Sequence, residues 1–209
     1  MHVNRSLAWH YAAAVLAVLV LAAPLAGQTG QTDQFTPSAA RAAVHIDNFG
    51  KISDTYYRGA QPEATDYADL AALGIHTVID LTRDGRDDEQ GLVQRSGMQF
   101  YRIPLTTTDR PSAAAIAQFL TLVSDPVNQP VYVHCQGGRH RTGVMTAVYR
   151  MTRDGWSADR AYQEMKQFNF EGFPGHPVLK QFVYDYYSQF GRSRVAGTQT
   201  ASTTVATLH

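Results

Sequence analysis

The 209-residue sequence contains a single cysteine, Cys135, and only three lysines. A lone cysteine excludes a disulfide within the chain, so the thiol is either a core residue or a reactive group. Net charge is also lacking, because 18 basic residues balance 18 acidic ones. Without an excess of charge there is no general attraction to nucleic acid or to an anionic membrane, and any anion-binding site must be local.

Long apolar runs are scarce, and the longest covers thirteen residues, from Tyr11 to Ala23. Arg5 precedes this run, and small residues with a proline follow it, which is the layout of a secretory signal peptide at residues 1–26. The run is short for a membrane span, but Leu7–Trp9 could lengthen it, so an uncleaved membrane anchor is the alternative. In either case we expect the remaining chain to be exported, to the periplasm or to the medium.

Composition divides the rest of the chain into one domain between two polar segments. Residues 27–43 are rich in Gln, Thr, Ala and Gly without a strong period, and we interpret them as a linker. The tail at residues 192–209 consists mostly of small and polar residues and is predicted to be disordered. A single domain remains at residues 44–191, which is close to the usual domain size.

Within this domain, short apolar segments alternate with segments of helical periodicity. Strands are predicted at residues 55–59, 75–81, 98–105 and 130–135. Helices are predicted at residues 62–74, 87–97, 112–125, 142–155, 157–168 and 177–190. Ser112 and Ser157 are suited to cap the helices that they begin. The alternation predicts an α/β fold, with a central, mostly parallel sheet flanked by helices.

The lone cysteine follows the last predicted strand, in the stretch VHCQGGRHRTG at residues 133–143. In open parallel sheets, ligands bind outside the carboxyl ends of the strands. Gly137 and Gly138 allow the backbone to turn tightly, so that successive N–H groups can point into one anion-binding concavity. The helix that follows adds the positive end of its dipole. The loop between this strand and helix is therefore predicted to bind a phosphate.

Arg141 lies six positions after Cys135, and a curled loop would return its guanidinium to the sulfur. The planar fork of donors in arginine matches two phosphate oxygens at once. The same positive surroundings favour the thiolate over the thiol. A thiolate beside a phosphate site is the combination needed to attack a phosphate ester through a phospho-cysteine intermediate. The alternative is that the thiol only packs in the core.

The stretch HCQGGRHRTG resembles the signature of the cysteine-dependent protein tyrosine and dual-specificity phosphatases, in which His-Cys is followed by five residues, Arg, and Thr or Ser. The segments YYRGAQP, LGIHTVIDL and IPL occur in the order seen in the compact dual-specificity branch. The Arg-His before the signature Arg is similar to the atypical plant and fungal group. The resemblance spans roughly residues 56–187.

This resemblance implies that Cys135 is the nucleophile, that Arg141 clamps the phosphate and stabilises the transition state, and that Thr142 assists the thiolate. The implied phosphate-binding residues are Gln136, Gly137, Gly138, Arg139, His140, Arg141 and Thr142. No metal ion or cofactor is expected, and the eight histidines show no ligand spacing such as H-E-x-x-H.

Cleavage of a phosphate monoester also needs an acid that protonates the leaving oxygen. Phosphatases of this type place an aspartate on the loop before the helix that precedes the signature strand. In this chain the loop reads LTTTDRPSA, and we expect Asp109 to be the acid. A turn or cap role beside Pro111 is the alternative for Asp109. Asp84, Asp87 and Asp88 are the other candidate donors, although a solvated loop also explains them.

Several further side chains are given structural roles. Arg58 is expected to satisfy backbone carbonyls near the site, and His134 is expected to order the loop by hydrogen bonding. The aromatic residues within 168–177 are expected to belong to the core rather than to a substrate platform. The same is expected of three tyrosines in the last predicted helix, Tyr184, Tyr186 and Tyr187.

The predicted function is metal-independent hydrolysis of phosphomonoesters, with a phosphorylated protein as the substrate. The alternative is the same chemistry on an inositol polyphosphate or another small phosphate ester, which the Arg-His resemblance favours. A phosphate-binding module without catalysis is less favoured, because a binder has no need of a thiolate. Thiol-disulfide exchange is excluded, because there is no C-x-x-C and no resolving cysteine. No nucleic-acid partner is expected, and membrane contact is expected only if the N-terminal segment is uncleaved.

Overall fold

The computed structural model describes residues 44–171 and 175–190. The predicted signal peptide at 1–26, the linker at 27–43 and the tail at 192–209 lie outside the described residues. These three assignments therefore stay predictions. Within the described ranges, none of the helices combines the length and the apolar composition that crossing a bilayer requires.

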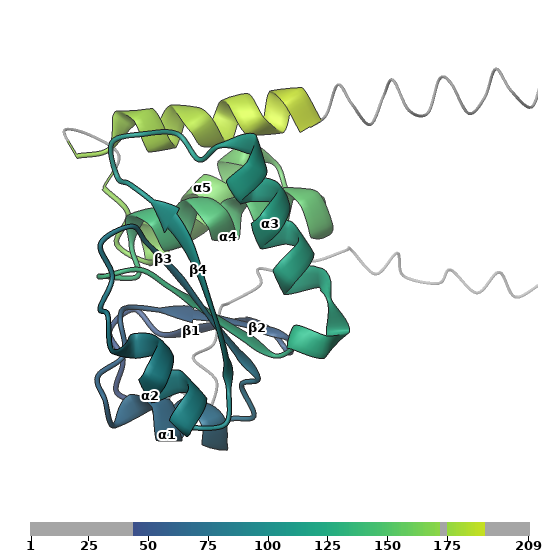
Figure 1. Cartoon of the computed structure of the whole chain (residues 1–209). Helices are drawn as coiled ribbons and strands as arrows, with labels where there is room; N and C mark the ends of the chain where they lie inside the picture. Colours follow the sequence, from purple (N-terminus) through teal and green to yellow (C-terminus); the bar gives the residue numbers. More distant parts are fainter. Residues whose placement is uncertain (1–43, 172–174, 191–209) are drawn as a thin grey trace, which may run out of the picture. The chain divides into compact units, whose positions relative to one another are not determined.

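A five-stranded sheet forms the centre of the domain (Figure 1). Its strands are β1 (Gly50–Ser53), β2 (Tyr56–Gly59), β3 (Thr77–Thr82), β4 (Gln99–Leu105) and β5 (Val131–His134), in the order β1-β2-β5-β3-β4. The β2–β5, β5–β3 and β3–β4 pairs are parallel, whereas β1 is antiparallel to β2. This arrangement confirms the predicted mostly parallel α/β sheet. The edge strand β1 was not predicted, because its four residues carry no clear alternation.

The helices agree with the sequence prediction in number and order. They are α1 (Asp66–Ala72), α2 (Glu89–Arg95), α3 (Ala113–Ser124), α4 (His140–Arg153), α5 (Ala158–Gln167) and a helix at residues 177–190, with a 3-10 turn at Pro126–Asn128. Ser112 and Ser157 each accept a hydrogen bond from the N–H three residues later, at 3.2 Å, which confirms both caps. Helix α4 begins two residues earlier than predicted, because the Gly143 N–H already bonds to the Arg139 carbonyl.

Helices α1 and α2 cover one face of the sheet, and the remaining helices lie on the other face (Figure 1). Side chains alternate between the faces as they must along a strand. In β5, Val131 and Val133 join the hydrophobic cluster that includes α3 and α4, while Tyr132 joins the cluster under α1 and α2. The buried strands are therefore apolar on both faces, as expected for a covered parallel sheet.

A third hydrophobic cluster joins α4, α5 and the helix at 177–190. Phe170 is 5% exposed in this cluster, which confirms the core role expected for that aromatic residue. Tyr184 and Tyr186 pack against the cluster while partly exposed. The core role expected for Tyr187 is wrong, because this residue is 41% exposed.

The strand order places the phosphate-binding loop at the middle of one edge of the sheet. Strand β5 lies between β2 and β3, and all three run in the same direction. The segments that follow β2, β3, β4 and β5 therefore leave the sheet at the same edge. Cys135 comes directly after β5, so the other three segments surround the loop that it begins.

Candidate active site

Cys135 lies at the base of the loop that joins β5 to α4. It is 3% exposed and belongs to the main hydrophobic cluster, which includes Ile79 and Val133. Low exposure alone fits both an inert core thiol and a nucleophile at the base of a binding loop. The backbone that follows Cys135 distinguishes the two.

Three consecutive carbonyl groups of the loop are bound from outside it. The Gln61 N–H donates to the Gln136 carbonyl at 3.1 Å, and Asn48 Nδ2 donates to the Gly137 carbonyl at 2.7 Å. The Gly138 carbonyl accepts from Arg58 Nη2. The N–H of each following residue points opposite to the carbonyl of the same planar peptide group. Three N–H groups in succession therefore face the other side of the loop, which is the arrangement of an anion-binding nest.

The two side chains that donate to the loop carbonyls, Arg58 and Asn48, are themselves held in place. Arg58 is fully buried and lies over the Phe168 ring, with its guanidinium carbon 4.0 Å from the ring centre. Burial lowers the pKa of Arg58. Asn169 Nδ2 donates to Asn48 Oδ1 at 2.7 Å, so the second donor is also fixed. The structural role expected for Arg58 is confirmed by its bond to the Gly138 carbonyl.

Gly138 occupies a place that no other residue fits. Its φ is +63°, and a Cβ atom built on it would lie 2.4 Å from the carbonyl carbon of Gly59. We expect Gly138→Ala to lower the free energy of unfolding by more than about 2 kcal/mol, because left-handed backbone costs about 1–2 kcal/mol and the contact adds to it. Urea unfolding measures the change.

Gly155→Ala is the matched control for Gly138→Ala. Gly155 also has a positive φ, of +69°, but nothing lies within 4 Å of its Cβ position. It should therefore show the backbone cost alone, about 1 kcal/mol. Equal losses in the two variants would contradict a close approach between the loop and Gly59.

Arg141 is buried at the first turn of α4, with 9% of its surface exposed. Its Nη1 lies 3.5 Å from the Leu105 carbonyl oxygen and 3.7 Å from Asp84 Oδ1. Its Nε has no hydrogen-bond partner among the described residues. A buried guanidinium with such long contacts has donors to spare for a phosphoryl group.

Two neighbours of Cys135 and Arg141 also lie within the core. The Thr142 hydroxyl is buried and has no hydrogen-bond partner in the described part of the chain, so it is free to donate. His134 is fully buried, and its Nε2 lies 2.9 Å from Glu89 Oε1. The expectation that His134 orders the loop by hydrogen bonding needs correction, because neither ring nitrogen makes a hydrogen bond within the described residues and the close contact of this side chain is with Glu89, behind the loop.

His140, within the loop, contacts a histidine from another segment. The rings of His140 and His176 have their centres 3.9 Å apart, and His176 Nδ1 lies 3.2 Å from the Thr107 carbonyl oxygen. Burial, together with His176, lowers the pKa of His140 to about 4. His140 is therefore neutral at neutral pH, and the positive charge of the loop comes from its arginines.

Asp109 lies on an exposed loop that borders the site. Its Oδ2 accepts hydrogen bonds from the hydroxyls of Thr106 and Thr108, at 2.7 and 3.3 Å. The Thr107 carbonyl of this loop contacts His176, and the Leu105 carbonyl just before it contacts Arg141. Within the described ranges, the carboxylate of Asp109 makes no hydrogen bond or ion pair with Cys135 or Arg141. The structure thus places the loop beside the site, and the acid role stays a prediction.

The other candidate acids are divided by the structure. Asp84 is 90% exposed at its side chain and lies 3.7 Å from Arg141, so it borders the site. Asp88 pairs instead with Arg86 at 2.9 Å. Asp87 is exposed and has no ion pair among the described residues. Only Asp84 of this set contacts the signature loop.

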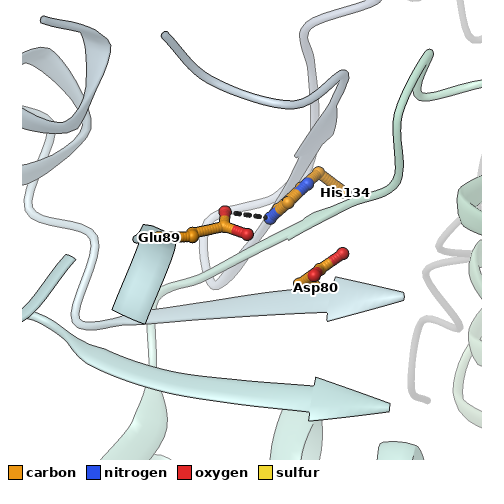
Figure 2. A group of neighbouring side chains, drawn as sticks. All are labelled: Asp80, Glu89 and His134. Carbon is orange, nitrogen blue, oxygen red and sulfur yellow. Dashed lines mark ion pairs between the residues drawn. The ribbon is translucent and has the colours of Figure 1, made fainter. Parts of the chain in front are cut away.

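One group of side chains has the spacing of a metal site. Ligand atoms of Asp80, Glu89 and His134 lie within 4.8 Å of one another, and all three residues are buried (Figure 2). Arg102 Nε lies 2.7 Å from Asp80 Oδ2, and Thr82 donates to both oxygens of Asp80. The Arg102 guanidinium thus already pairs with Asp80, so we assign no metal to this cluster.

Sequence reasoning missed the residues that hold the loop from behind. Asn48 and Glu89 come from segments without a recognisable motif, and Gln61 lies in YYRGAQP, where the resemblance assigns it no role. Glu89 follows two aspartates in DDEQ, and this run resembles a solvated face. Asn48 has a φ of +53°, in the left-handed region that asparagine tolerates, but the sequence alone does not reveal this conformation.

Comparisons with known proteins agree with this geometry. A family model described as "DSP-PTPase phosphatase fused to NAD+ Kinase" matches residues 42–177. The dual specificity protein phosphatase TpbA of Pseudomonas aeruginosa is 32% identical over 160 residues, which cover 76% of this chain and 71% of that protein. The inositol diphosphatase SIW14 of Saccharomyces cerevisiae is 24% identical over 162 residues, covering 75% of this chain and 56% of SIW14.

Solved structures of the same two proteins resemble the domain. The crystal structure of TpbA has a TM-score of 0.57 and 28% identity, and the match covers 66% of this chain and 83% of that chain. The core catalytic domain of SIW14 has a TM-score of 0.61 and 22% identity, with 74% of this chain and 94% of that chain covered. The likeness to SIW14 at this identity concerns the fold.

Proposed function

Since the chain belongs to the family of cysteine-dependent dual-specificity and tyrosine phosphatases, we propose that it removes phosphoryl groups from phosphorylated proteins, with Cys135 as nucleophile and Arg141 as phosphate clamp. The observation that best supports these roles is the loop whose carbonyls at residues 136–138 are all bound from outside. Its N–H groups then face the side on which a phosphoryl group would lie.

The residues support a two-step reaction. The Cys135 thiolate attacks phosphorus and forms an S–P bond while the bond to the leaving oxygen breaks. Asp109 donates a proton to that oxygen and becomes a carboxylate. This carboxylate then accepts a proton from a water molecule that attacks phosphorus, and the P–S bond breaks to return the thiolate and release phosphate. Arg141 and the loop N–H groups bind the oxygens throughout, and the Thr142 hydroxyl supports the departing thiolate.

The acid role of Asp109 gives a prediction that depends on the leaving group. We expect Asp109→Asn to lower kcat by about 10²-fold for alkyl or phenyl phosphates, because their leaving oxygens need a proton. An activated aryl phosphate, whose oxygen leaves as an anion, should lose only a few-fold. Steady-state kinetics over a series of leaving groups measures the contrast.

Asp84→Asn is the matched control for Asp109→Asn, because Asp84 is the other exposed aspartate beside the site. It should show no dependence on the leaving group. A uniform loss in Asp109→Asn, or a selective loss in Asp84→Asn, would contradict the assignment.

A second candidate substrate is an inositol polyphosphate, and one observation favours it. Arg83 and Arg139 are exposed in the two segments that follow β3 and β5, and neither has an acidic partner within the described residues. Two free guanidinium groups at this edge suit a substrate that carries several phosphates. The neutral His140 adds no charge to them.

One assay separates the two substrate classes. Release of inorganic phosphate would be measured for a phosphotyrosine peptide, a phosphothreonine peptide and soluble inositol polyphosphates, with Cys135→Ser as the control protein. Higher kcat/KM for the peptides is the result expected. If only the inositol polyphosphates were hydrolysed, the proposal of a protein substrate would be overturned. If no compound in the panel were hydrolysed, the proposed function would be overturned.

We also propose that the protein is exported, to the periplasm or to the medium. The support is the layout of residues 1–26 in the sequence. The intact mass of the protein recovered from its host would give its first residue and so distinguish a cleaved signal from a retained anchor.

A further inference from the structure

A fully buried carboxylate lies behind the phosphate-binding loop. Glu89, the first residue of α2, is 0% exposed, and its Oε1 accepts hydrogen bonds from Gln61 Nε2 at 2.8 Å and from the Tyr67 hydroxyl at 2.9 Å. His134 Nε2 lies 2.9 Å from the same oxygen, off the axis of a straight hydrogen bond (Figure 2). Arg102 Nη2 lies 3.6 Å from Oε2. Side chains from four other segments thus meet at this one acid.

Glu89 is ionised in these surroundings. Burial raises the pKa of its carboxyl group, but the contact with His134 and the hydrogen bonds from Gln61 and Tyr67 outweigh this effect and hold the pKa below its ordinary value. A buried anion is costly unless its partners stay in place. The orientations of Gln61 and His134 are therefore coupled to the position of the Glu89 carboxylate.

Both of these partners are joined to the phosphate-binding loop. His134 is bonded directly to Cys135, and the Gln61 N–H donates to the Gln136 carbonyl at 3.1 Å. The two contacts with Glu89 thus hold the chain on either side of the Cys135–Gln136 peptide. A shift of Glu89 would move the start of the loop relative to the donors at Asn48 and Arg58, which hold its middle.

We propose that Glu89 is a positioning residue for this phosphatase: through His134 and Gln61, it holds Cys135 and the N–H groups of the loop in the arrangement that binds an oxyanion. The proposal rests on the proposed function in that the loop binds a phosphoryl group. A displacement of about 1 Å at a reacting centre lowers rates by about 10²-fold, so a contact behind the loop has a measurable effect.

The test compares Glu89→Gln with a buried acid that does not touch the loop. Glu164 of α5 is 2% exposed and lies 2.7 Å from Arg150, so Glu164→Gln also removes a buried charge from an ion pair. Both variants would be studied under conditions in which urea unfolding shows them fully folded. The readouts are the Kd for tungstate, as an oxyanion probe, and kcat and KM for an aryl phosphate.

We expect Glu89→Gln to weaken tungstate binding by about 10-fold and to lower kcat by about 10²-fold, while Glu164→Gln stays within about 3-fold of the wild type. Folded Glu89→Gln with the tungstate affinity and the kcat of Glu164→Gln would overturn the proposal. Lower folding stability with unchanged tungstate affinity and unchanged kcat would also overturn the proposal, because a merely structural acid would show that result.

A second variant keeps the test decisive if Glu89→Gln does not fold. Gln61→Met has a similar shape at a half-buried position and removes the hydrogen bond to Glu89, while its backbone N–H is kept. It should weaken tungstate binding a few-fold, and unchanged binding would overturn the proposal. If the wild type binds tungstate but hydrolyses no phosphate ester, and the variants weaken that binding, the positioning role stands and the proposed function fails.

Discussion

Replacing Cys135 with serine is expected to lower kcat by about 10⁴-fold or more while phosphate binding is kept. A serine hydroxyl has nearly the size of the thiol but stays protonated at neutral pH, so the attacking anion is lost. Loss of a nucleophile in other enzymes lowers kcat by about 10⁶-fold. The N–H groups of the loop remain, because their positions depend on carbonyl contacts at residues 136–138 and not on sulfur. Arg141 also remains, because its contacts are with the Leu105 carbonyl and Asp84.

Two measurements check the Cys135→Ser result. Kinetics with an aryl phosphate gives kcat, and calorimetric titration with a phosphotyrosine peptide gives Kd. We expect a Kd within a few-fold of the wild-type KM. Turnover within about 10-fold of the wild type would contradict the nucleophile role. If both binding and turnover were lost, the result would instead show that the thiol shapes the loop.

Replacing Arg141 with lysine is expected to lower kcat/KM by about 10³-fold although the positive charge is kept. Only a guanidinium presents two parallel donors to two phosphoryl oxygens, whereas an ammonium is a point charge. Loss of one preorganised donor in an oxyanion site costs about 10²–10³-fold in rate. The long contacts of Arg141 with Leu105 and Asp84, at 3.5 and 3.7 Å, contribute little to folding, so the variant should be stable.

Arg153→Lys is the matched control, because Arg153 lies exposed at the other end of the same helix, α4. Its kcat/KM should equal that of the wild type. The comparison also needs the unfolding midpoints of both variants, so that a loss of fold is not mistaken for a loss of chemistry. Near-normal catalysis by Arg141→Lys would contradict the clamp role.

The fold was predictable because its information is local. Apolar segments such as 75–81 and 130–135 alternate with helical segments, and this alternation alone indicates a covered parallel sheet. Ser112 and Ser157 cap the helices that they precede. Strand β1 was missed because GKIS is short and lies at an edge, where pairing with β2 rather than its own pattern makes it a strand.

The site was predictable only in part. Cys135 and Arg141 share one contiguous loop, so their spacing is visible in the sequence. Arg58, 80 residues away, was expected to bind carbonyls near the site, and it binds the Gly138 carbonyl. Asn48 binds the loop from 89 residues away, and no motif in the sequence indicates this contact. Glu89 was hidden for a different reason: a charged residue among aspartates is usually solvated, and here helix α2 turns it into the protein.

The chemistry of one loop and the class of the fold could be predicted from the sequence, because both depend on residues that are neighbours in the chain. Most of the groups that hold that loop were identified only in the folded protein: Asn48 and Gln61 bind its carbonyls beside the predicted Arg58, and Glu89 lies behind His134. Buried polar groups must find hydrogen-bond partners. Which partners are within reach depends on the folded sheet, because its parallel strands bring their carboxyl ends to one edge.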